Sequence, residues 1–292
     1  MLPIPRTPLV RLGNLFHQRA VYAKCEFLAP SGCFKIRGAV HLLERLSRDG
    51  NKCELIVPSS GNTAVGAAVA AKAFGYRMTG VVPKAIAKAK DDKLRALGVE
   101  LLKIDGGGSE LLRTATELAK DRGGYFVHPH LDTAWTDGYK AIAAETLEDL
   151  PDCRSIVFPV GGGGLLMGIL AHLREHPASV RLIGCEPHNY PKYARFSHIR
   201  SKTIADGLVL ENPHPIVQQA IAEADIEIAL VSESAIRTAI RELFQTHALV
   251  VEPSSAITLA QAKSHQLPEP ICVVLTGENI VRDDHQRLMA ET

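Results

Sequence analysis

The chain has 292 residues, of which 46% are hydrophobic and 22% are charged, and its formal net charge is +1. This is the composition of a globular chain long enough for one large or two medium domains. Because 33 basic residues balance 32 acidic ones, the charge favours neither nucleic acid nor an anionic membrane as a partner. No apolar run approaches the ~20 residues of a membrane span, and the proline-rich start lacks the apolar core of a signal peptide. We therefore expect a cytoplasmic protein.

Apolar runs rich in β-branched residues alternate with helical patterns along most of the chain. Predicted strands occupy 21–27, 54–58, 78–83, 100–104, 125–129, 155–160, 180–186, 226–231 and 271–276. Predicted helices between them include 62–75, 90–98, 109–123, 137–150 and 164–176. This alternation predicts an α/β fold of mostly parallel sheets covered by helices. Such sheets bind ligands beyond the carboxyl ends of their strands, so residues that follow strands are the first candidates for a site.

The six cysteines are scattered along the chain, without the spacing of a metal site: Cys25, Cys33, Cys53, Cys153, Cys185 and Cys272. Most of them lie within or beside apolar runs. This placement favours buried, reduced thiols over disulfides.

Lys35 stands at the start of a predicted helix, after the turn signal Ser31-Gly32. The residues that follow have apolar side chains at helical spacing up to Leu46. A cation is unfavourable at a helix N-terminus because of the helix dipole. A lysine there either reaches into water or has a chemical task, such as forming a Schiff base through its amine.

Two strand ends carry residues suited to binding anions. Ser59, Ser60, Gly61 and Asn62 follow the strand 54–58; they form either an ordinary helix cap or a cradle of hydroxyl and N–H groups for a carboxylate. Gly161, Gly162, Gly163 and Gly164 follow the strand 155–160 and precede a helix, where bare amides bind phosphate. Neither the dinucleotide-binding nor the P-loop spacing is present, which favours a cofactor with a single phosphate. Thr276, at the end of the strand 271–276, adds a third polar group.

Several ordered motifs resemble the fold type II pyridoxal-phosphate enzymes, which are tryptophan synthase β-like, and among them the serine/threonine dehydratase and serine racemase group. The motifs are TPLVRL (7–12), FKIRGA (34–39), SSGN (59–62), LRALGVEL (94–101), VHP (127–129), PVGGGGLL (159–166), TIADGL (203–208), VEPSSA (251–256) and LTGENI (275–280). They extend over nearly the whole chain in the family's order. The resemblance implies pyridoxal 5′-phosphate as the cofactor.

The resemblance assigns a role to each matching position. Lys35 holds the cofactor as a Schiff base and later serves as the base for the α-proton, and Phe34 packs beside the ring. Asn62 binds the phenolic oxygen. The glycines 161–164, with Leu165, bind the phosphate. Thr276 faces the pyridine nitrogen, where a hydroxyl leaves the ring largely neutral and favours elimination or replacement over transamination.

The residues expected to bind the substrate are Ser59, Ser60, Gly61, Asn62, Thr63 and His130. Ser60 is either a helix cap or the proton donor that serine racemases place opposite the lysine. Thr63 stands where dehydratases often have histidine, and threonine there is more usual in cysteine synthase and threonine synthase. Gly138-Tyr139-Lys140 replaces the Gly-Gln-Gly common in dehydratases. The sequence alone does not explain what this replacement does.

No metal site is expected. Racemase-like members place a divalent cation with Glu, Ala and Asp, where this chain has Glu186, Tyr190 and Lys192. A lysine in place of the acid would repel a cation, and its ammonium would replace it. His128 and His130 would face one side of a strand, but no third ligand accompanies them at a suggestive spacing.

The main hypothesis is β-elimination of L-serine, L-threonine or a close 3-hydroxy amino acid to a 2-oxo acid and ammonia. The alternatives are a racemase that uses Lys35 and Ser60 on opposite faces, a cysteine synthase-like β-replacement enzyme, and a non-catalytic amino-acid binder, which the intact Lys35 disfavours. We expect a homodimer with two interleaved domains. A small mobile substrate-binding domain would occupy 50–135, a large cofactor-binding domain would comprise 1–49 and 136–292, and no separate regulatory module would follow.

Overall fold

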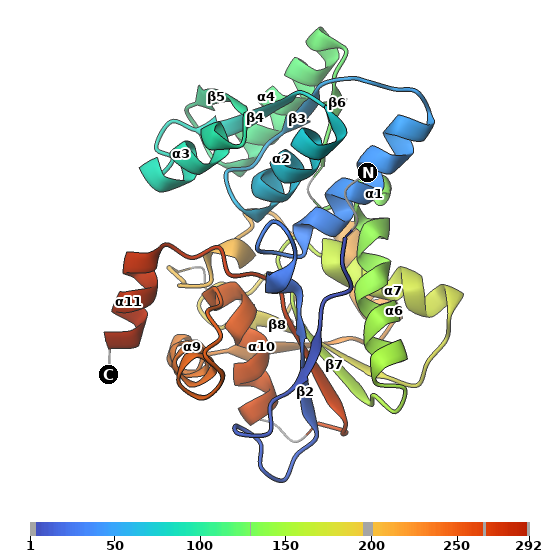
Figure 1. Ribbon diagram of the computed structural model, residues 1–292, viewed down its shortest axis with the longest axis vertical. Coiled ribbons are helices and arrows are strands. Elements are labelled where there is room, and N and C mark those ends of the chain that lie inside the picture. Colours follow the sequence, from blue (N-terminus) through green and yellow to red (C-terminus); the bar gives the residue numbers. More distant parts are fainter. Residues whose placement is uncertain (1–3, 129, 195–200, 265–266, 291–292) are drawn as a thin grey trace. The chain divides into compact units, whose positions relative to one another are not determined.

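The computed structural model describes residues 4–128, 130–194, 201–264 and 267–290 (Figure 1). The chain divides into two compact units. The first comprises Met1–Pro5 and Ala29–Tyr139, and the second comprises Arg6–Leu28 and Lys140–Thr292. In the described part of the chain, no helix is both long and apolar enough to cross a membrane.

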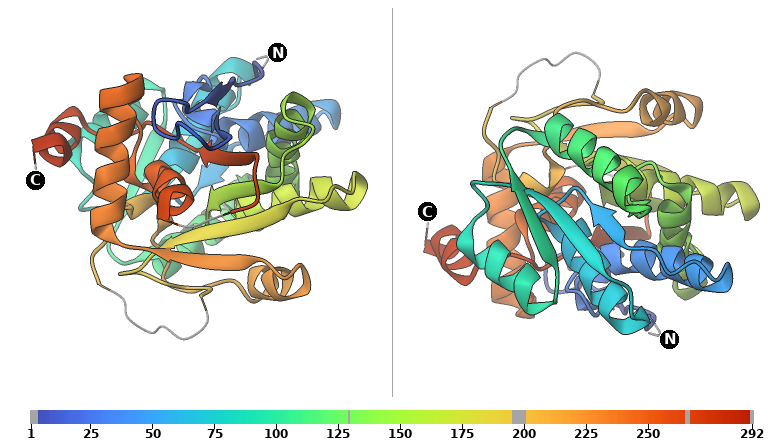
Figure 2. Two further views of the ribbon diagram at one scale, coloured as in Figure 1. Left: turned by 90° about the horizontal axis from the view of Figure 1, so that it is seen from below. Right: turned by 90° about the horizontal axis from the view of Figure 1, so that it is seen from above.

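The first unit is built on a four-stranded parallel sheet with the order β5-β4-β3-β6. Its strands are β3 (Leu55–Val57), β4 (Met78–Pro83), β5 (Glu100–Ile104) and β6 (Tyr125–Phe126), and its helices are α1 (Lys35–Arg48), α2 (Asn62–Phe74), α3 (Lys88–Ala96), α4 (Gly108–Arg122), α5 (Thr133–Thr136) and the short 3₁₀ helix η2 (Asp137–Tyr139). Figure 2 shows α4 on one face of this sheet and α2 on the other. Ile56, Val81, Ala115 and Ala119 form the core beneath α4.

The second unit contains a six-stranded sheet with the order β1-β2-β10-β7-β8-β9. Its strands are β1 (Leu9–Arg11), β2 (Val21–Cys25), β7 (Ser155–Pro159), β8 (Arg181–Pro187), β9 (Glu227–Val231) and β10 (Ile271–Leu275). Its α-helices are α6 (Lys140–Asp149), α7 (Gly164–Glu175), α8 (Pro215–Glu223), α9 (Glu233–His247), α10 (Pro253–Ser264) and α11 (Arg282–Ala290), and its 3₁₀ helices are η1 (Glu26–Leu28) and η3 (Asp206–Leu208). All strand pairs are parallel except β1 with β2.

Helices cover both faces of this larger sheet, with α9 and α10 on one side and α6 and α7 on the other (Figure 1). The central strands β7 and β10 are buried along their whole length. Their continuous apolar sequences are therefore explained by cover on both faces, as the α/β prediction requires. The predicted fold class is confirmed by the observed sheets.

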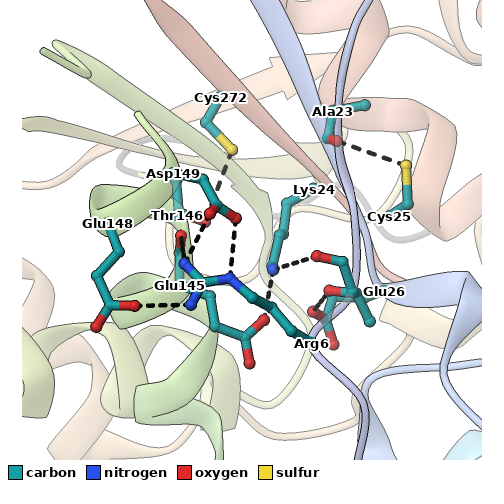
Figure 3. A network of polar contacts seen from close by, with 11 residues as sticks. Arg6, Ala23, Lys24, Cys25, Glu26, Glu145, Thr146, Glu148, Asp149 and Cys272 are labelled. Atoms are coloured by element: carbon teal, nitrogen blue, oxygen red, sulfur yellow. Dashed lines mark hydrogen bonds and ion pairs between the residues drawn. The ribbon is translucent and has the colours of Figure 1, made fainter. Parts of the chain in front are cut away.

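A polar network, buried around Lys24 and exposed at Arg6, joins the start of the second unit to α6 (Figure 3). Lys24 of β2 is fully buried, and its ammonium donates to the carbonyl of Thr7 at 2.7 Å and to the carboxylate of Glu145 at 2.5 Å. Arg6 donates to Asp149 at 2.7 Å and to the carbonyl of Glu145 at 3.1 Å. These bonds tie the segment before β1 to α6, although the two are far apart in the sequence.

The structure differs from several predicted elements; for example, the predicted strand 21–27 ends at Cys25, and Glu26–Leu28 form a 3₁₀ helix. The antiparallel strand β1 was not predicted, since only three residues form it. The predicted strand 125–129 is shorter: β6 ends at Phe126, and residue 129 lies outside the described residues. The helix predicted for 137–150 begins as a 3₁₀ turn and becomes α-helical at Lys140.

The division into units also differs from the predicted domain boundaries. The helix α1 was expected in the larger domain, with the smaller one beginning at residue 50. It belongs instead to the first unit, which extends from Ala29 to Tyr139. The reason is close packing: a Cβ added to Gly66 of α2 would lie 2.9 Å from the backbone nitrogen of Ile36 in α1. A sequence pattern identifies each helix but not the neighbour on which it packs.

Candidate active site

Lys35 is the first residue of α1 and is half-buried. Its ammonium lies 4.7 Å from the ring centre of Phe34 and 5.7 Å from that of Tyr139. The two rings are themselves in contact, with their centres 4.8 Å apart. Aromatic faces attract a cation at these distances, which offsets the unfavourable position at a helix N-terminus. The amine is therefore held beside an aromatic pair instead of extending into water.

Tyr139 is the residue of this group that the sequence did not identify. It is fully buried, and its hydroxyl accepts a hydrogen bond from the indole N–H of Trp135. Burial raises the pKa of Tyr139 well above its ordinary value, so the phenol stays neutral. The departure Gly138-Tyr139-Lys140 from the family pattern was the available signal, and the structure explains it: Tyr139 supplies a ring beside Lys35.

Two glycines allow other elements to approach the first turn of α1 closely. A Cβ at Gly66 would lie 2.9 Å from the carbonyl carbon of Lys35 and 3.0 Å from its Cβ. A Cβ at Gly138 would lie 2.4 Å from the carbonyl oxygen of Arg37. Real Cβ atoms do not approach backbone this closely. Both positions therefore require glycine, and the close packing fixes where Lys35 begins its helix.

The N-terminus of α2 lies next to the segment that carries Lys35. Its cap is Gly61, which has no side chain, and the thiol of Cys33 donates to the carbonyl of Asn62 at 3.8 Å. The hydroxyl of Ser59 accepts the Gly61 N–H at 3.2 Å. Ser60 therefore does not cap the helix, and the cap interpretation of this residue is wrong. A helix N-terminus without a side-chain cap is suited to bind a carboxylate.

The remaining candidates for substrate binding lie at the start of α2, just before it, or in the loop after β6. Thr63 is buried in the first turn of α2, whereas Ser59, Ser60 and Asn62 are half-buried. His130 lies after β6, and its backbone N–H donates to Nδ1 of His128 at 3.3 Å. The two histidines thus do not share one side of a strand, as the longer predicted strand implied.

In the second unit, the four glycines connect β7 to α7. Gly163 caps α7 in the left-handed conformation with φ of 89°, and a Cβ there would lie 2.5 Å from Val217. A Cβ at Gly161 would lie 3.3 Å from the carbonyl oxygen of Gly207. The Val217 side chain and the Gly207 carbonyl therefore pack against the loop, and the helix N-terminus is bare of side chains. This is the arrangement of a phosphate site.

Thr276 follows β10 directly and is buried. The next residue is anchored from both sides: the Gly277 N–H donates to the hydroxyl of Ser255 at 3.4 Å, and its carbonyl accepts the N–H of Glu252 at 3.0 Å. The VEPSSA motif therefore fixes the end of this strand. Ser254 of the same motif meets Gly207, where a Cβ would lie 2.8 Å from its hydroxyl.

The predicted site residues fall into two groups. The first unit brings together Lys35, Phe34 and the segment 59–63, and the second unit contains Gly161–Gly164, Leu165 and Thr276. Within the first unit, the amine beside aromatic rings has the chemistry to bind an aldehyde; within the second unit, the side-chain-free helix N-terminus suits a phosphate and the buried hydroxyl suits a ring nitrogen, which are the groups that pyridoxal 5′-phosphate carries. Among the described residues, no group of three or more His, Cys, Asp or Glu side chains could hold a metal.

Comparison with known proteins agrees with this chemistry. The L-threonine ammonia-lyase of Thermotoga maritima is 32% identical over 269 residues, which cover 89% of this chain and 67% of that protein. The structure of processed threonine deaminase isoform 2 from Solanum lycopersicum matches with a TM-score of 0.88 and 25% identity, covering 98% of this chain and 82% of that one. Maize serine racemase matches with a TM-score of 0.84 and 25% identity, covering 98% and 93%.

The family model described as "Pyridoxal-phosphate dependent enzyme" matches residues 1–277. This range includes every candidate site residue from Phe34 to Thr276. The expected resemblance and cofactor are thereby confirmed. The chain belongs to the pyridoxal-phosphate-dependent enzyme family.

Proposed function

We propose that this protein is an ammonia-lyase that converts L-threonine, L-serine or a close 3-hydroxy amino acid to a 2-oxo acid and ammonia. One observation carries the proposal: within one unit, the first turn of α1, which Lys35 begins, packs against α2, and Cys33 just before it contacts Asn62 at the N-terminus of α2. A proton acceptor next to a carboxylate site is what abstraction of an α-proton from an amino acid requires. The threonine ammonia-lyase of Thermotoga maritima, at 32% identity, supports this reaction class.

Each unit contains residues suited to hold a part of the cofactor. Lys35 would hold it through the amine, Phe34 would pack beside its ring, and Asn62 would donate to its phenolic oxygen. The amides of Gly161–Gly164 and Leu165 would hold the phosphate, assisted by the dipole of α7. When bound, pyridoxal phosphate supplies an electron sink for the pair released from the Cα–H bond.

The protein's own groups would then move the protons. The amine of Lys35 would take the proton from Cα and return it to the hydroxyl group on Cβ, which then leaves as water while the electron pair of the Cα–H bond forms the Cα–Cβ double bond. Thr276 would donate to or accept from the ring nitrogen, and a neutral hydroxyl does not stabilise a protonated ring as a carboxylate would. The weaker sink favours prompt loss of the β-substituent, and thus elimination over transamination.

The substrate carboxylate would lie at the start of α2. Ser59, Gly61, Asn62 and Thr63 offer hydroxyl, amide and backbone N–H groups there, and the helix dipole favours the negative charge. His130 would lie near the substrate side chain. A mobile smaller unit that covers bound substrate would expel water and protect the unsaturated product. A cytoplasmic homodimer remains part of the proposal.

Racemisation is a second candidate, favoured by Ser60. Because Gly61 caps α2, the Ser60 hydroxyl is not used for capping and could donate a proton. A racemase needs such a donor on the face opposite Lys35. Maize serine racemase shares the fold with a TM-score of 0.84.

The test combines absorbance with product analysis. The purified protein should absorb near ~415 nm through the cofactor held by Lys35, and the Lys35→Ala variant should lose this band. A panel of L-threonine, L-serine and other 3-hydroxy amino acids is then scored for oxo acid, with and without an added thiol. Oxo acid from L-threonine or L-serine supports elimination. A thioether product without oxo acid would refute it in favour of β-replacement.

The role of Ser60 is tested on the same substrates. With L-serine, the Ser60→Ala variant should lose D-serine formation while it retains pyruvate formation. If both activities fall together, Ser60 does not act as the second proton donor. A protein that makes neither product and lacks the absorbance band would contradict both candidate functions.

A further inference from the structure

A buried ion pair lies at the carboxyl end of β8. Glu186 of this strand and Lys192 of the following loop have fully buried side chains, and the Lys192 ammonium is 3.1 Å from the Glu186 carboxylate. Taking two charges out of water costs several kcal/mol for each ion unless they pair well. The loop has therefore folded around a neutralised pair.

Backbone amides complete the surroundings of the Glu186 carboxylate. It accepts the N–H groups of Lys192 at 3.0 Å, Tyr193 at 3.1 and 3.2 Å, and Ala194 at 3.1 Å. One of its oxygens faces the ammonium and one amide, and the other accepts from three amides. Neither oxygen is thus left open for a metal ion, which would also meet the positive charge of Lys192 at close range.

The same pair holds the loop in place. Because three successive amides bind the carboxylate, the segment 192–194 wraps around the end of β8. Tyr193 extends this anchoring, since its hydroxyl accepts the backbone N–H of His214 just before α8. Loss of the charge on Lys192 would leave Glu186 buried and uncompensated beneath this loop.

We propose that the ammonium of Lys192 is a built-in counter-ion of Glu186, which occupies the place that a divalent cation would need at the carboxyl end of β8. The protein neutralises Glu186 with its own side chain and therefore has no need of a metal to hold the segment 192–194 at the end of β8. The inference rests on contacts within the second unit alone. It stands independently of which reaction the enzyme catalyses.

The wild-type protein provides the first arm of the test. Thermal unfolding of the cofactor-loaded protein is followed in EDTA and in millimolar MgCl₂, CaCl₂ or MnCl₂, and each metal is also titrated by calorimetry. Tm should be the same in all four solutions, and no saturable heat should appear. A saturable heat or a metal-dependent rise in Tm that the Glu186→Gln variant abolishes would overturn the proposal.

Lys192→Asp provides the second arm. It places a second buried carboxylate beside Glu186, and the two repel each other unless a cation lies between them. In EDTA, Tm should fall by roughly 10 °C, and divalent cations should raise it again. The matched control is Arg181→Asp, at the pair between Arg181 and Glu227. That pair is exposed, with side chains 52% and 38% accessible, so the control should lose little stability and show no response to metal.

A charge-removal series keeps the proposal testable if Lys192→Asp does not fold. In EDTA, Lys192→Met should be markedly less stable than wild type, because Glu186 is then an unpaired buried charge. The double variant Lys192→Met/Glu186→Gln should recover part of that loss, and the difference measures the pair directly. A double variant no more stable than Lys192→Met, or Lys192→Asp as stable in EDTA as wild type, would show that Lys192 is not the counter-ion.

Discussion

The close approach of α2 to α1 makes Gly66→Ala a sharp test of how Lys35 is positioned. The new methyl carbon would lie 2.9 Å from the carbonyl carbon of Lys35 and from the nitrogen of Ile36. Carbon contacts normally begin near ~3.5 Å, so the helices must separate by about 0.5–1 Å. Overpacking of this kind costs about 1–3 kcal/mol, and the better helix propensity of alanine returns about 1 kcal/mol.

The upper end of this range applies because the obstructing atoms belong to backbone and Cβ, which cannot rotate away. We expect a net loss of about 2 kcal/mol, which lowers Tm by roughly 4–8 °C in a chain of this size. A displacement of the Lys35 amine by up to ~1 Å should also lower kcat by as much as ~100-fold. The assays are thermal unfolding and oxo-acid formation at saturating substrate.

Gly13→Ala is the control for this experiment. Gly13 has open space where its Cβ would be, so the substitution should leave Tm and kcat nearly unchanged. Gly66→Ala with wild-type Tm and wild-type kcat would refute the reasoning that helix contact positions Lys35. A loss of Tm with unchanged kcat would show that the contact stabilises the unit without placing the amine.

Three further outcomes are expected. Lys24→Met should destabilise the protein by about 3–5 kcal/mol in urea unfolding, because it removes the fully buried ammonium that pairs with Glu145. A loss below about 1 kcal/mol would contradict a buried pair. Tyr139→Phe should lose about 1–3 kcal/mol of stability, because the indole N–H of Trp135 loses its acceptor, but it should keep kcat. Tyr139→Leu should lower both stability and kcat, because it also removes the ring beside Lys35. Equal kcat in the two variants would exclude the ring as the partner of Lys35. In the native protein, a thiol reagent at pH 8 should modify Cys53 first, because the other cysteines are buried. Burial also raises the pKa of such thiols, for example that of Cys153 to about 11, which keeps them protonated and unreactive. Early modification of any other cysteine would contradict the described burial.

Periodicity predicted most of the fold because strands and helices bury their apolar faces locally. The predicted strand 78–83 coincides with β4, and the strand 271–276 differs from β10 only at Thr276. The short antiparallel β1 could not be predicted, because its three residues are held by pairing with β2 and carry no alternating pattern of their own.

The candidate site was predictable where the chemistry belongs to short motifs. Lys35 and the glycines 161–164 could be proposed as site residues because each belongs to a short motif that precedes a helix. Tyr139 was not identified, since its ring meets Lys35 through the turn that α5 and η2 make against α1. That turn depends on the close approach of Gly138 to Arg37, which no local pattern reveals.

Ser60 and Lys192 show the two ways in which neighbours decide a role. A serine just before a helix is a common N-cap residue, yet α2 begins one residue later than such a cap would require, and its N-cap is Gly61. Lys192 was expected to repel a metal, and the structure adds that its ammonium is fully buried against Glu186. Whether a polar group caps, pairs or reacts therefore depends on which backbone groups already surround it.

The attachment of the cofactor to Lys35 is the central claim, and it can be measured directly. The purified protein, loaded with pyridoxal 5′-phosphate, is reduced with borohydride to fix the cofactor to its amine, digested, and mapped by mass spectrometry. The account predicts a single phosphopyridoxyl group, on the peptide that contains Lys35. Labelling of a different lysine, or an unlabelled Lys35 in a protein saturated with cofactor, would contradict it.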